Sequence, residues 1–507
     1  MCLWRFFIKG IVSIQYKFSN WLSNPYNTRH IPSFLHFAMK QILSLGRSTF
    51  ATLRYESRLY VDKTDLICKL CRDRCQVLFT RPRCFGKTLT LSTIDSLFSK
   101  GLEEFKGLAI EKHWSDTTYD VVSLDFSSLK FFMDLDSFRR GLVSLLVSSF
   151  QSLGFVYQGH SLLSCVDNHR FWLKKRSKSS LVLLIDEYDT PLTSQLDSGK
   201  VQDIARELEL FYGVLSECSD VFRFALVIGV TQLKDFCLFN VFPDLKDVTY
   251  DDRFSTLVGF TDKEIIENFS GHLDVAAQIT GMNTNELTAC LVDLYGGYRF
   301  SHSSDTCVVN PWSLLNFLDD PQSGFAPYWV ASAGNTRNLY KFIERSELSQ
   351  PLSFFKKKLL STEQIKCAGI NDDGEVLALL IQAGYLTIEG GWETGKISVS
   401  FPNNEIKVSV AMLLADELLG GQRWQASNRQ NAIDIIRTGT VDEIKQLFRE
   451  TLESLHQQGK VVTAVSEQCT IIGLLLTASV GFQKNLNLKP PFLEVIVDNR
   501  TLCLNLS

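Results

Sequence analysis

Short apolar runs, each ending in a polar residue or a turn, most strongly constrain the fold of this 507-residue chain. Residues 181–186 (LVLLID) and 222–230 (FRFALVIGV) are apolar on both faces, which is typical of strands at the centre of a parallel sheet. Residues 76–80 (QVLFT) and 121–126 (VVSLDF) predict two further strands. Helical patterns separate these runs, at residues 88–99, 138–153 and 201–216. This alternation predicts an α/β fold with a doubly wound parallel sheet.

The length and the charge set the limits within which this fold must be placed. A single hydrophobic core stops growing near roughly 250–300 residues, so at least two or three domains are expected. The net charge of −4 argues against a protein that coats nucleic acid over its whole surface. Residues 1–55 carry seven basic side chains and no acid, which leaves a net charge of −11 on the remainder.

The basic, aromatic head is expected to be a poorly ordered leader over residues 1–40, with Met39 as an alternative initiator. A transit-like or membrane-surface segment is the alternative. No run reaches the roughly 18–20 apolar residues that a membrane span needs, and residues 471–482 predict a buried helix. The cysteines do not form a disulfide framework, so a reducing, cytoplasmic location is expected.

Three cysteines at close spacing raise the possibility of a zinc site. Cys68, Cys71 and Cys75 could bind the metal with Cys84 as a fourth ligand. Cys84, however, falls within a loop that fits phosphate better, and the other three are spaced as on one face of a helix. A helical face of free thiols is therefore the preferred interpretation.

Residues 81–88 (RPRCFGKT) lie between the first predicted strand and the first predicted helix, where a phosphate-binding loop belongs. Such a loop offers backbone N–H groups and a helix N-terminus to an anion, a Lys to the β- and γ-phosphates, and a hydroxyl to Mg²⁺. Gly86, Lys87 and Thr88 supply the second half of the G-x-x-x-x-G-K-[ST] pattern, and Arg81 stands where the first Gly would be. ATP and Mg²⁺ are the predicted cofactors, with Lys87 also catalytic. The candidate cofactor-binding residues are Arg81, Pro82, Arg83, Cys84, Phe85, Gly86, Lys87 and Thr88.

An acidic pair follows the third predicted strand, at the sheet edge where open α/β folds bind ligands. Asp186 is expected to hold Mg²⁺ together with Thr88, and Glu187 is expected to polarise the attacking water. Thr231, at the end of the fourth strand, is a candidate sensor of the γ-phosphate or a simple strand-end cap.

The later part of the chain predicts smaller units. Helices are expected at 261–269 and 285–295, with Thr261 and Asn285 as N-caps. A helix at 375–383 ending at Gly384, with strands at 385–388 and 396–401, resembles a winged-helix module. The expected organisation is a leader (1–40), a P-loop core with the doubly wound sheet (41–255), a helical lid (256–358), a winged-helix-like unit (359–425) and a last unit (426–507).

In combination, these motifs resemble the AAA-ATPase-like proteins, which are often bacterial and many of which carry a PD-(D/E)XK nuclease-like domain. The resemblance runs from about residue 41 to about residue 420. The family loop typically reads R-P-R-R-F-G-K-S, so Arg81 is the family's own variant, and Cys84 and Thr88 are local departures. The resemblance implies ATP binding. The segments that carry it are 60–64 (YVDKT), 81–88, 121–127 (VVSLDFS), 183–192 (LLIDEYDTPL), 245–249, 252–254, 259–261, 298–300, 310–311 and 401–405 (FPNNE).

Two questions about catalysis follow from this resemblance. An arginine could complete the ATP site, and Arg83, Arg253 and Arg299 are the candidates. A nuclease of this type needs an acidic residue followed by E-x-K on a strand, and Glu405 with Lys407 lies upstream of that region. Glu494 and Asp498 fall on a strand-like run, but no E-x-K follows. The nuclease-like remnant that the resemblance implies at residues 426–507 is expected to be truncated or decayed, and no DNA cleavage is predicted.

Three functions remain open from the sequence. The leading hypothesis is an ATP-binding protein with Mg²⁺-dependent hydrolysis coupled to a conformational change. The second is a non-hydrolysing nucleotide switch or interaction module, with a protein partner or self-association. The third is nucleic-acid binding through the winged-helix-like unit, which the acidic Glu389 and Glu393 of its wing disfavour.

Overall fold

The computed structural model describes residues 41–332, 358–418 and 439–457, apart from positions 74, 197, 235, 237, 302–303 and 391–394. It also places Ile343, residues 434–435 and the backbone of three strands near the C-terminus. Within these ranges, no helix has both the length and the apolar character required to cross a bilayer. The predicted leader (1–40) and the predicted buried helix (471–482) lie outside the described residues.

A five-stranded parallel sheet organises the first part of the chain, in the order β2-β3-β4-β1-β5. The four predicted strands are confirmed, and Asp125 of β2 pairs in register with Asp186 of β3. A fifth strand was not predicted because it is only three residues long and has no apolar run. The strands are β1 (Gln76–Thr80), β2 (Asp120–Asp125), β3 (Leu181–Asp186), β4 (Phe222–Gly229) and β5 (Leu245–Asp247).

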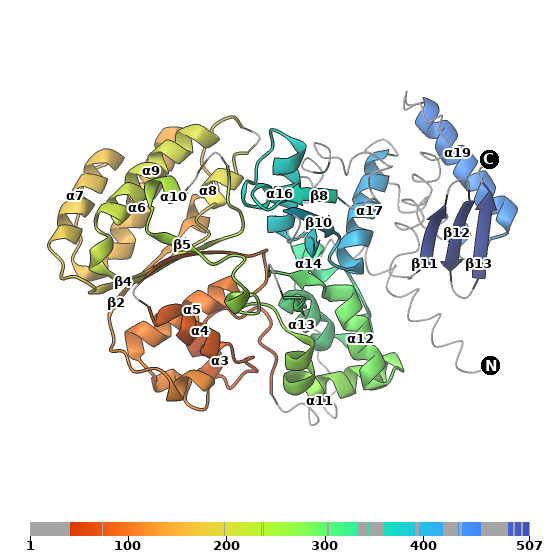
Figure 1. The fold of residues 1–507 in the computed structure, drawn as a ribbon, viewed down its shortest axis with the longest axis horizontal. Helices are drawn as coiled ribbons and strands as arrows, with labels where there is room; N and C mark the ends of the chain where they lie inside the picture. The colour runs from red at the N-terminus through yellow and green to blue at the C-terminus, as the bar shows by residue number, and fades with distance from the viewer. Residues whose placement is uncertain are drawn as a thin grey trace.

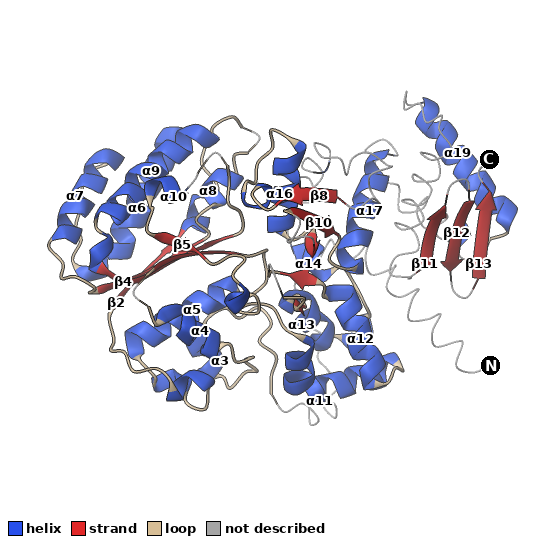
Figure 2. Cartoon of the chain, in the orientation of Figure 1, coloured by secondary structure: helices blue, strands red, loops and turns tan. Residues whose placement is uncertain are grey.

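Helices cover both faces of this sheet (Figure 2). Alternate residues of β3 point to opposite faces, so Val182 and Leu184 join one core and Leu183 and Ile185 join the other. This arrangement agrees with the predicted α/β fold. One face carries α3 (Phe50–Tyr55), α4 (Thr64–Cys71) and α5 (Lys87–Lys100), and the other carries α6 (Leu135–Phe150), α7 (Leu162–Lys174) and α9 (Val201–Glu217).

A helical region follows, and Figure 1 shows it beside the sheet domain. Thr261 caps α11 with a reciprocal capping box, as predicted. The predicted cap at Asn285 is wrong, because Asn283 caps α12 by accepting the Glu286 N–H, and Asn285 lies inside the helix. The elements are α11 (Asp262–Thr280), α12 (Thr284–Tyr295), β6 (Tyr298–Arg299), β7 (Cys307–Val308), α13 (Pro311–Asp319) and α14 (Tyr328–Ser332).

A small β–α unit comes next, with a three-stranded antiparallel sheet in the order β8-β10-β9. Gly384 ends α16 in the left-handed region, at φ 91°, as the sequence predicted. The unit is bonded to the sheet domain after β4, where the Gln232 N–H donates to Gln382 Oε1 at 2.7 Å. Its elements are β8 (Lys358–Ser361), α16 (Asp373–Ala383), β9 (Thr387–Gly390), β10 (Lys396–Ser400) and α17 (Asn404–Leu418).

The last elements are a helix and an antiparallel meander. The helix is α19 (Val441–Gln457). The strands are β11 (Asn485–Lys489), β12 (Phe492–Val497) and β13 (Arg500–Asn505), in sequential order. Glu494 lies on β12, as the strand-like pattern suggested, and Asp498 lies outside the described residues.

Candidate nucleotide-binding site

The loop between β1 and α5 has the backbone shape of an anion site. Cys84 and Gly86 adopt left-handed φ values of 63° and 100°, and Phe85 between them does not. Alternation of this kind turns successive N–H groups to one side and creates a concave set of donors. Gly86 is also the N-cap of α5, so the first N–H groups of that helix are added to the set. The sequence prediction of a phosphate loop therefore has a matching local geometry.

Lys87 is buried beneath this loop and is held by it. Its ammonium donates to the carbonyl oxygens of Arg81 and Pro82, at 2.9 and 2.8 Å. Burial lowers the pKa of Lys87, and the neighbouring Asp186 carboxylate partly offsets that effect. A phosphate placed in the loop would supply the negative charge that these neutral carbonyls do not.

Thr88 and Asp186 meet across the sheet edge. The Thr88 hydroxyl donates to Asp186 Oδ2 at 2.8 Å, and Asp186 Oδ1 is buried with no partner among the described residues. Burial raises the pKa of Asp186 to about 6, and the Thr88 hydrogen bond opposes that rise. A buried carboxylate oxygen beside a hydroxyl is a fitting pair of oxygen ligands for Mg²⁺, which favours such donors.

Glu187 lines the same cavity as the loop. Its backbone is left-handed, at φ 52°, and its carboxylate accepts a hydrogen bond from the Thr190 hydroxyl at 2.9 Å. A non-glycine residue in this region is strained by roughly 1–2 kcal/mol, a pattern that often marks functional positions.

Thr231 is placed differently from the other predicted site residues. Its hydroxyl and its N–H both donate to Asp189 Oδ2, at 2.6 and 2.8 Å, and it does not line the cavity. Asp189 thereby joins the end of β3 to the end of β4. Of the two roles considered for Thr231, these bonds are those of a strand-end cap, and the sensing role stays a prediction.

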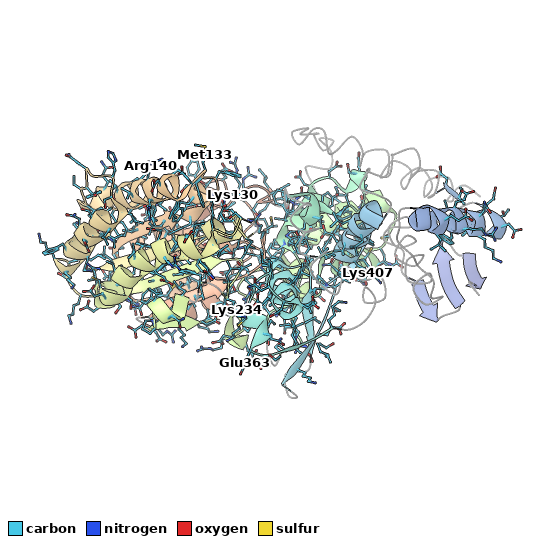
Figure 3. The ribbon with its side chains drawn as sticks, turned by 90° about the horizontal axis from the view of Figure 1, so that it is seen from above. Lys130, Met133, Arg140, Lys234, Glu363 and Lys407 are labelled. Atoms are coloured by element: carbon cyan, nitrogen blue, oxygen red, sulfur yellow. The ribbon has the colours of Figure 1, made fainter. Side chains whose placement is uncertain are left out.

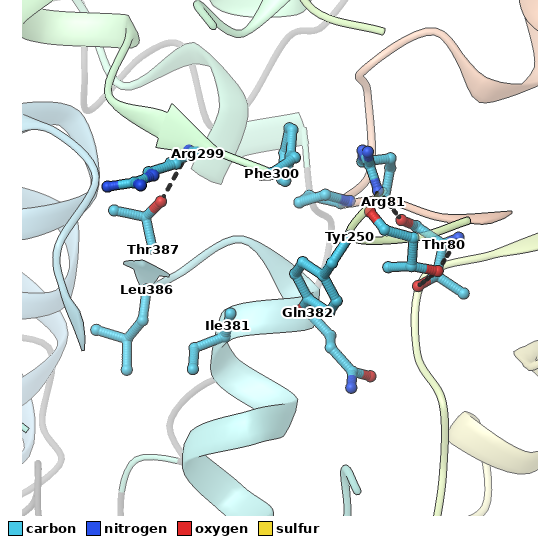
Figure 4. Close-up of a pocket in the computed structure, with 11 residues that line it drawn as sticks. Thr80, Arg81, Tyr250, Arg299, Phe300, Ile381, Gln382, Leu386 and Thr387 are labelled. Atoms are coloured by element: carbon cyan, nitrogen blue, oxygen red, sulfur yellow. Dashed lines mark hydrogen bonds between the residues drawn. The ribbon is translucent and has the colours of Figure 1, made fainter. Parts of the chain in front are cut away.

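Arg81 also departs from the expected geometry, because its side chain turns away from the loop. The guanidinium is buried against the rings of Phe79 and Phe300, 4.3 and 4.5 Å from their centres. Figure 4 shows Arg81 and Phe300 close together. It donates to the carbonyls of Thr80, Thr249 and Phe254. Burial lowers the pKa of Arg81 to about 9. The Arg81 side chain therefore faces these rings and carbonyls, and the cofactor-binding role of Arg81 stays a prediction.

Pro82 packs on the β–α unit, where a Cβ on Gly384 would lie 2.7 Å from Pro82 Cβ. Neither Arg81 nor Pro82 lines the cavity beside the loop. Both residues instead fix the base of the loop, so that the residues from Arg83 onward can face a ligand.

The cavity beside the loop has a volume of about 620 Å³, within the usual range for a small-molecule site. The lining is mixed, and its polar groups include those of Arg83 to Thr88, Asp186 and Glu187. The apolar part of the lining comes from segments that lie far apart in sequence. It includes Leu59, Tyr60, Val61, Leu257, Val258, Phe260, Trp312 and Leu315.

Among the three arginines predicted for the site, only Arg83 lines the cavity. Arg253 is exposed and pairs with Asp251. Arg299 donates to the Glu389 carbonyl at 2.9 Å, and Figure 4 shows Arg299 on the opposite side of the picture from Arg81. The structure adds cations that the sequence did not single out. Arg47, Lys63 and Lys130 also line the cavity.

Lys63 and Lys130 line the cavity from two segments that lie apart in the sequence. Lys63 pairs with Glu264 of α11 at 2.5 Å, so it joins the sheet domain to the helical region. Lys130 follows β2, and Figure 3 shows it near Met133 along one edge of the sheet domain. Lys130 lies beyond the motif at residues 121–127, so sequence reasoning had no signal for it.

The cysteines do not form the single helical face that was expected. Cys68 and Cys71 are buried free thiols on α4, whereas Cys75 lies beyond the end of that helix, just before β1. Cys84 lies in the phosphate loop and lines the cavity.

The sheet order, the loop between β1 and α5, and the acidic end of β3 are consistent with a P-loop NTPase. Residues 44–239 match the AAA-ATPase-like family, described as a predicted AAA-ATPase. The resemblance drawn from the motifs is thus confirmed over this segment, which contains both halves of the polar site, and it implies a nucleotide ligand.

A curated relative shares a larger part of the chain. The sequence is similar to an uncharacterized protein in the vnfD 5' region of Azotobacter chroococcum mcd 1, at 29% identity over 391 residues. The match covers 73% of this chain and 70% of that protein.

Proposed function

We propose that this protein binds ATP with Mg²⁺ in the cavity beside the loop and hydrolyses it to drive a conformational change. The observation that carries the proposal is the unpartnered Asp186 Oδ1, buried beside the Thr88 hydroxyl at the N-terminus of α5. A buried carboxylate oxygen without a donor is costly unless a cation or a proton reaches it. The adjacent phosphate-type loop indicates a metal ion bound together with a nucleotide.

Each part of the cavity has a role in this proposal. The N–H groups of the loop and Lys87 hold the β- and γ-phosphates, and Arg83 faces the γ-phosphate. Thr88 and Asp186 hold Mg²⁺, which would neutralise phosphate charge during hydrolysis. The apolar residues of the lining would contact the nucleotide base. The helical region would act as a lid, since it supplies Trp312 and Leu315 to that lining. The β–α unit would act as a winged-helix-like module.

Glu187 would orient the attacking water, because it lines the cavity next to the metal-binding residues. Its hydrogen bond from Thr190 favours a second candidate, in which the nucleotide is bound but not hydrolysed. In that case the chain would be a nucleotide switch, and occupancy alone would change how the helical region sits.

Two measurements test these proposals. Titration of the purified protein with ATP and Mg²⁺, compared with Lys87→Ala, should show binding that the substitution weakens at least 100-fold. Unchanged affinity in Lys87→Ala would refute the site. Steady-state phosphate release from wild type and Glu187→Gln then separates the two candidates. Turnover that Glu187→Gln abolishes supports hydrolysis, and bound ATP without turnover in either protein supports the switch.

A further inference from the structure

The outer side of the phosphate loop is held by a tryptophan from another part of the chain. The indole N–H of Trp329, on α14, donates to the Arg83 carbonyl at 2.9 Å. Trp329 is fully buried and does not line the cavity. The contact joins residues 246 positions apart, and neither the loop motif nor the nucleotide chemistry accounts for it.

The peptide group between Arg83 and Cys84 transmits this contact to the ligand side. In a trans peptide the C=O and N–H groups point in opposite directions. Because the Arg83 carbonyl faces Trp329, the Cys84 N–H points the other way, where Cys84 lines the cavity. This N–H has no acceptor among the described residues, so it is available to a phosphate oxygen. Trp329 therefore sets the direction of one anion-binding donor.

Trp329 is itself fixed by a buried carboxylate from the β–α unit. Glu405, in the first turn of α17, is completely buried, and its Oε1 accepts the backbone N–H of Trp329 at 2.7 Å. The Ser313 hydroxyl of α13 donates to both carboxylate oxygens, at 2.9 and 3.1 Å. One side chain thus joins α13, α14 and α17, and E-x-K at 405–407 lies on a helix instead of a nuclease strand.

A second contact runs beside the first. Tyr385 follows α16 and packs edge-on against Trp329, with 5.2 Å between the centres of the two rings. Gly384, beside it, lies against Pro82. The β–α unit consequently touches both the loop and the residue that orients it. Movement of α17 or of the α16–β9 turn cannot leave Trp329 undisturbed, because all of these groups are close-packed.

We propose that Glu405 and Trp329 are positioning residues that couple the β–α unit to the phosphate loop, so that the position of this unit regulates nucleotide affinity. The inference rests on the proposed nucleotide site and adds its regulation. Nucleotide binding therefore changes the environment of Trp329. By linkage, a ligand that moves the unit changes the nucleotide affinity, and the nucleotide changes the affinity for that ligand by the same factor.

The affinity test compares Trp329→Phe, Glu405→Ala and the double variant with wild type, with ATP and Mg²⁺ as the probe. Trp329→Phe keeps an aromatic ring but removes the indole donor, so ATP should bind about fivefold more weakly, as expected for one lost hydrogen bond of about 1 kcal/mol. Glu405→Ala should give a loss of similar size. The double variant should be no weaker than the worse single variant, because both act through one contact.

Controls separate positioning from a general loss of structure. Trp172→Phe, on α7 in the other core, should bind ATP as wild type does. Glu405→Gln retains the shape and one acceptor for the Trp329 N–H, so it should keep at least half of the wild-type affinity. If Glu405→Ala does not fold, Trp329→Phe provides the test.

A spectroscopic readout isolates the contact itself. The chain has eight tryptophans, and 5-fluorotryptophan labelling with Trp329→Phe assigns the Trp329 ¹⁹F resonance. That resonance should shift when ATP and Mg²⁺ are added, and the Trp172 resonance should not. Wild-type protein that binds no ATP would refute the nucleotide site and the coupling together. ATP binding with an unmoved Trp329 resonance, or with unchanged affinity in Trp329→Phe, would refute the coupling alone.

Discussion

Replacing Asp186 with Asn should make the nucleotide-free protein more stable while removing Mg²⁺-dependent ATP binding. Asp186 is buried beside Thr88, and its Oδ1 has no partner among the described residues. An ionised carboxylate in this position loses hydration, and the one hydrogen bond from Thr88 does not replace it. Asn keeps the size and an acceptor for the Thr88 hydroxyl, but it carries no charge. The substitution therefore separates the stability penalty of the buried carboxylate from its proposed role in binding Mg²⁺.

The size of the effect follows from the pKa of Asp186, which burial raises from 3.8 to about 6. A carboxyl with a raised folded-state pKa destabilises the protein once pH exceeds the unfolded value, and the penalty is complete above the folded value. Two pKa units correspond to about 3 kcal/mol at pH 7.5. At pH 4.5 the folded carboxyl is protonated and the penalty falls to about 1 kcal/mol.

Urea unfolding without Mg²⁺ or nucleotide, at pH 7.5 and 4.5, measures this difference. Asp186→Asn should exceed wild type by about 3 kcal/mol at the higher pH and by about 1 kcal/mol at the lower. Asp125→Asn, at the exposed end of the adjacent strand, is the matched control and should not gain stability. A variant that is less stable than wild type at pH 7.5, or whose gain does not change with pH, would refute the account of Asp186.

Three further substitutions test the structure around the site. Burial lowers the pKa of His169 to about 3, so wild type should lose about 1.4 kcal/mol more than His169→Leu for each pH unit below 6.5 in urea unfolding; equal pH slopes would contradict this. Arg81→Met should lower the free energy of unfolding by about 3 kcal/mol, because it leaves buried carbonyls without a donor. Arg81→Lys should not restore wild-type stability, since a lysine lacks the several N–H donors of a guanidinium. A wild-type urea midpoint for either variant would contradict the stabilising role of these hydrogen bonds. Gly384→Ala should lower the free energy of unfolding by about 1–3 kcal/mol and weaken ATP binding, because the φ of Gly384 is 91° and an added Cβ would meet Pro82. Gly213→Ala is the control and should be tolerated, because an added Cβ would lie 3.8 Å from its nearest neighbour. Equal thermal midpoints for the two variants would refute the clash.

The local features of this chain were predictable because they depend on neighbouring residues. The run at residues 181–186 is apolar on both faces, which only a strand buried between two layers of helices tolerates, and it is β3. Thr261 caps α11 because its hydroxyl and Glu264 satisfy each other's backbone partners within one turn. The same logic misplaced the cap of α12, since Asn283 and Asn285 both precede plausible helical residues.

The candidate site was predictable in part, for a related reason. Lys87 and Thr88 begin α5 just after β1, and Asp186 ends β3; the parallel sheet brings the carboxyl ends of these strands to one edge. The direction of a long side chain is a different matter. Arg81 sits in the loop motif, yet its guanidinium turns to carbonyls that follow β5, and no residue near it in sequence indicates this.

The sequence by itself determined four strands of the parallel sheet, the Thr261 cap and the phosphate-loop motif, because these depend on contacts within a few residues. Only the tertiary structure decided the strand order, the apolar lining of the cavity and the contact of Trp329 with the phosphate loop. Glu405 shows the reason. It lies 76 residues from Trp329 and 92 from Ser313, and it acquires its partners only when three helices pack around it.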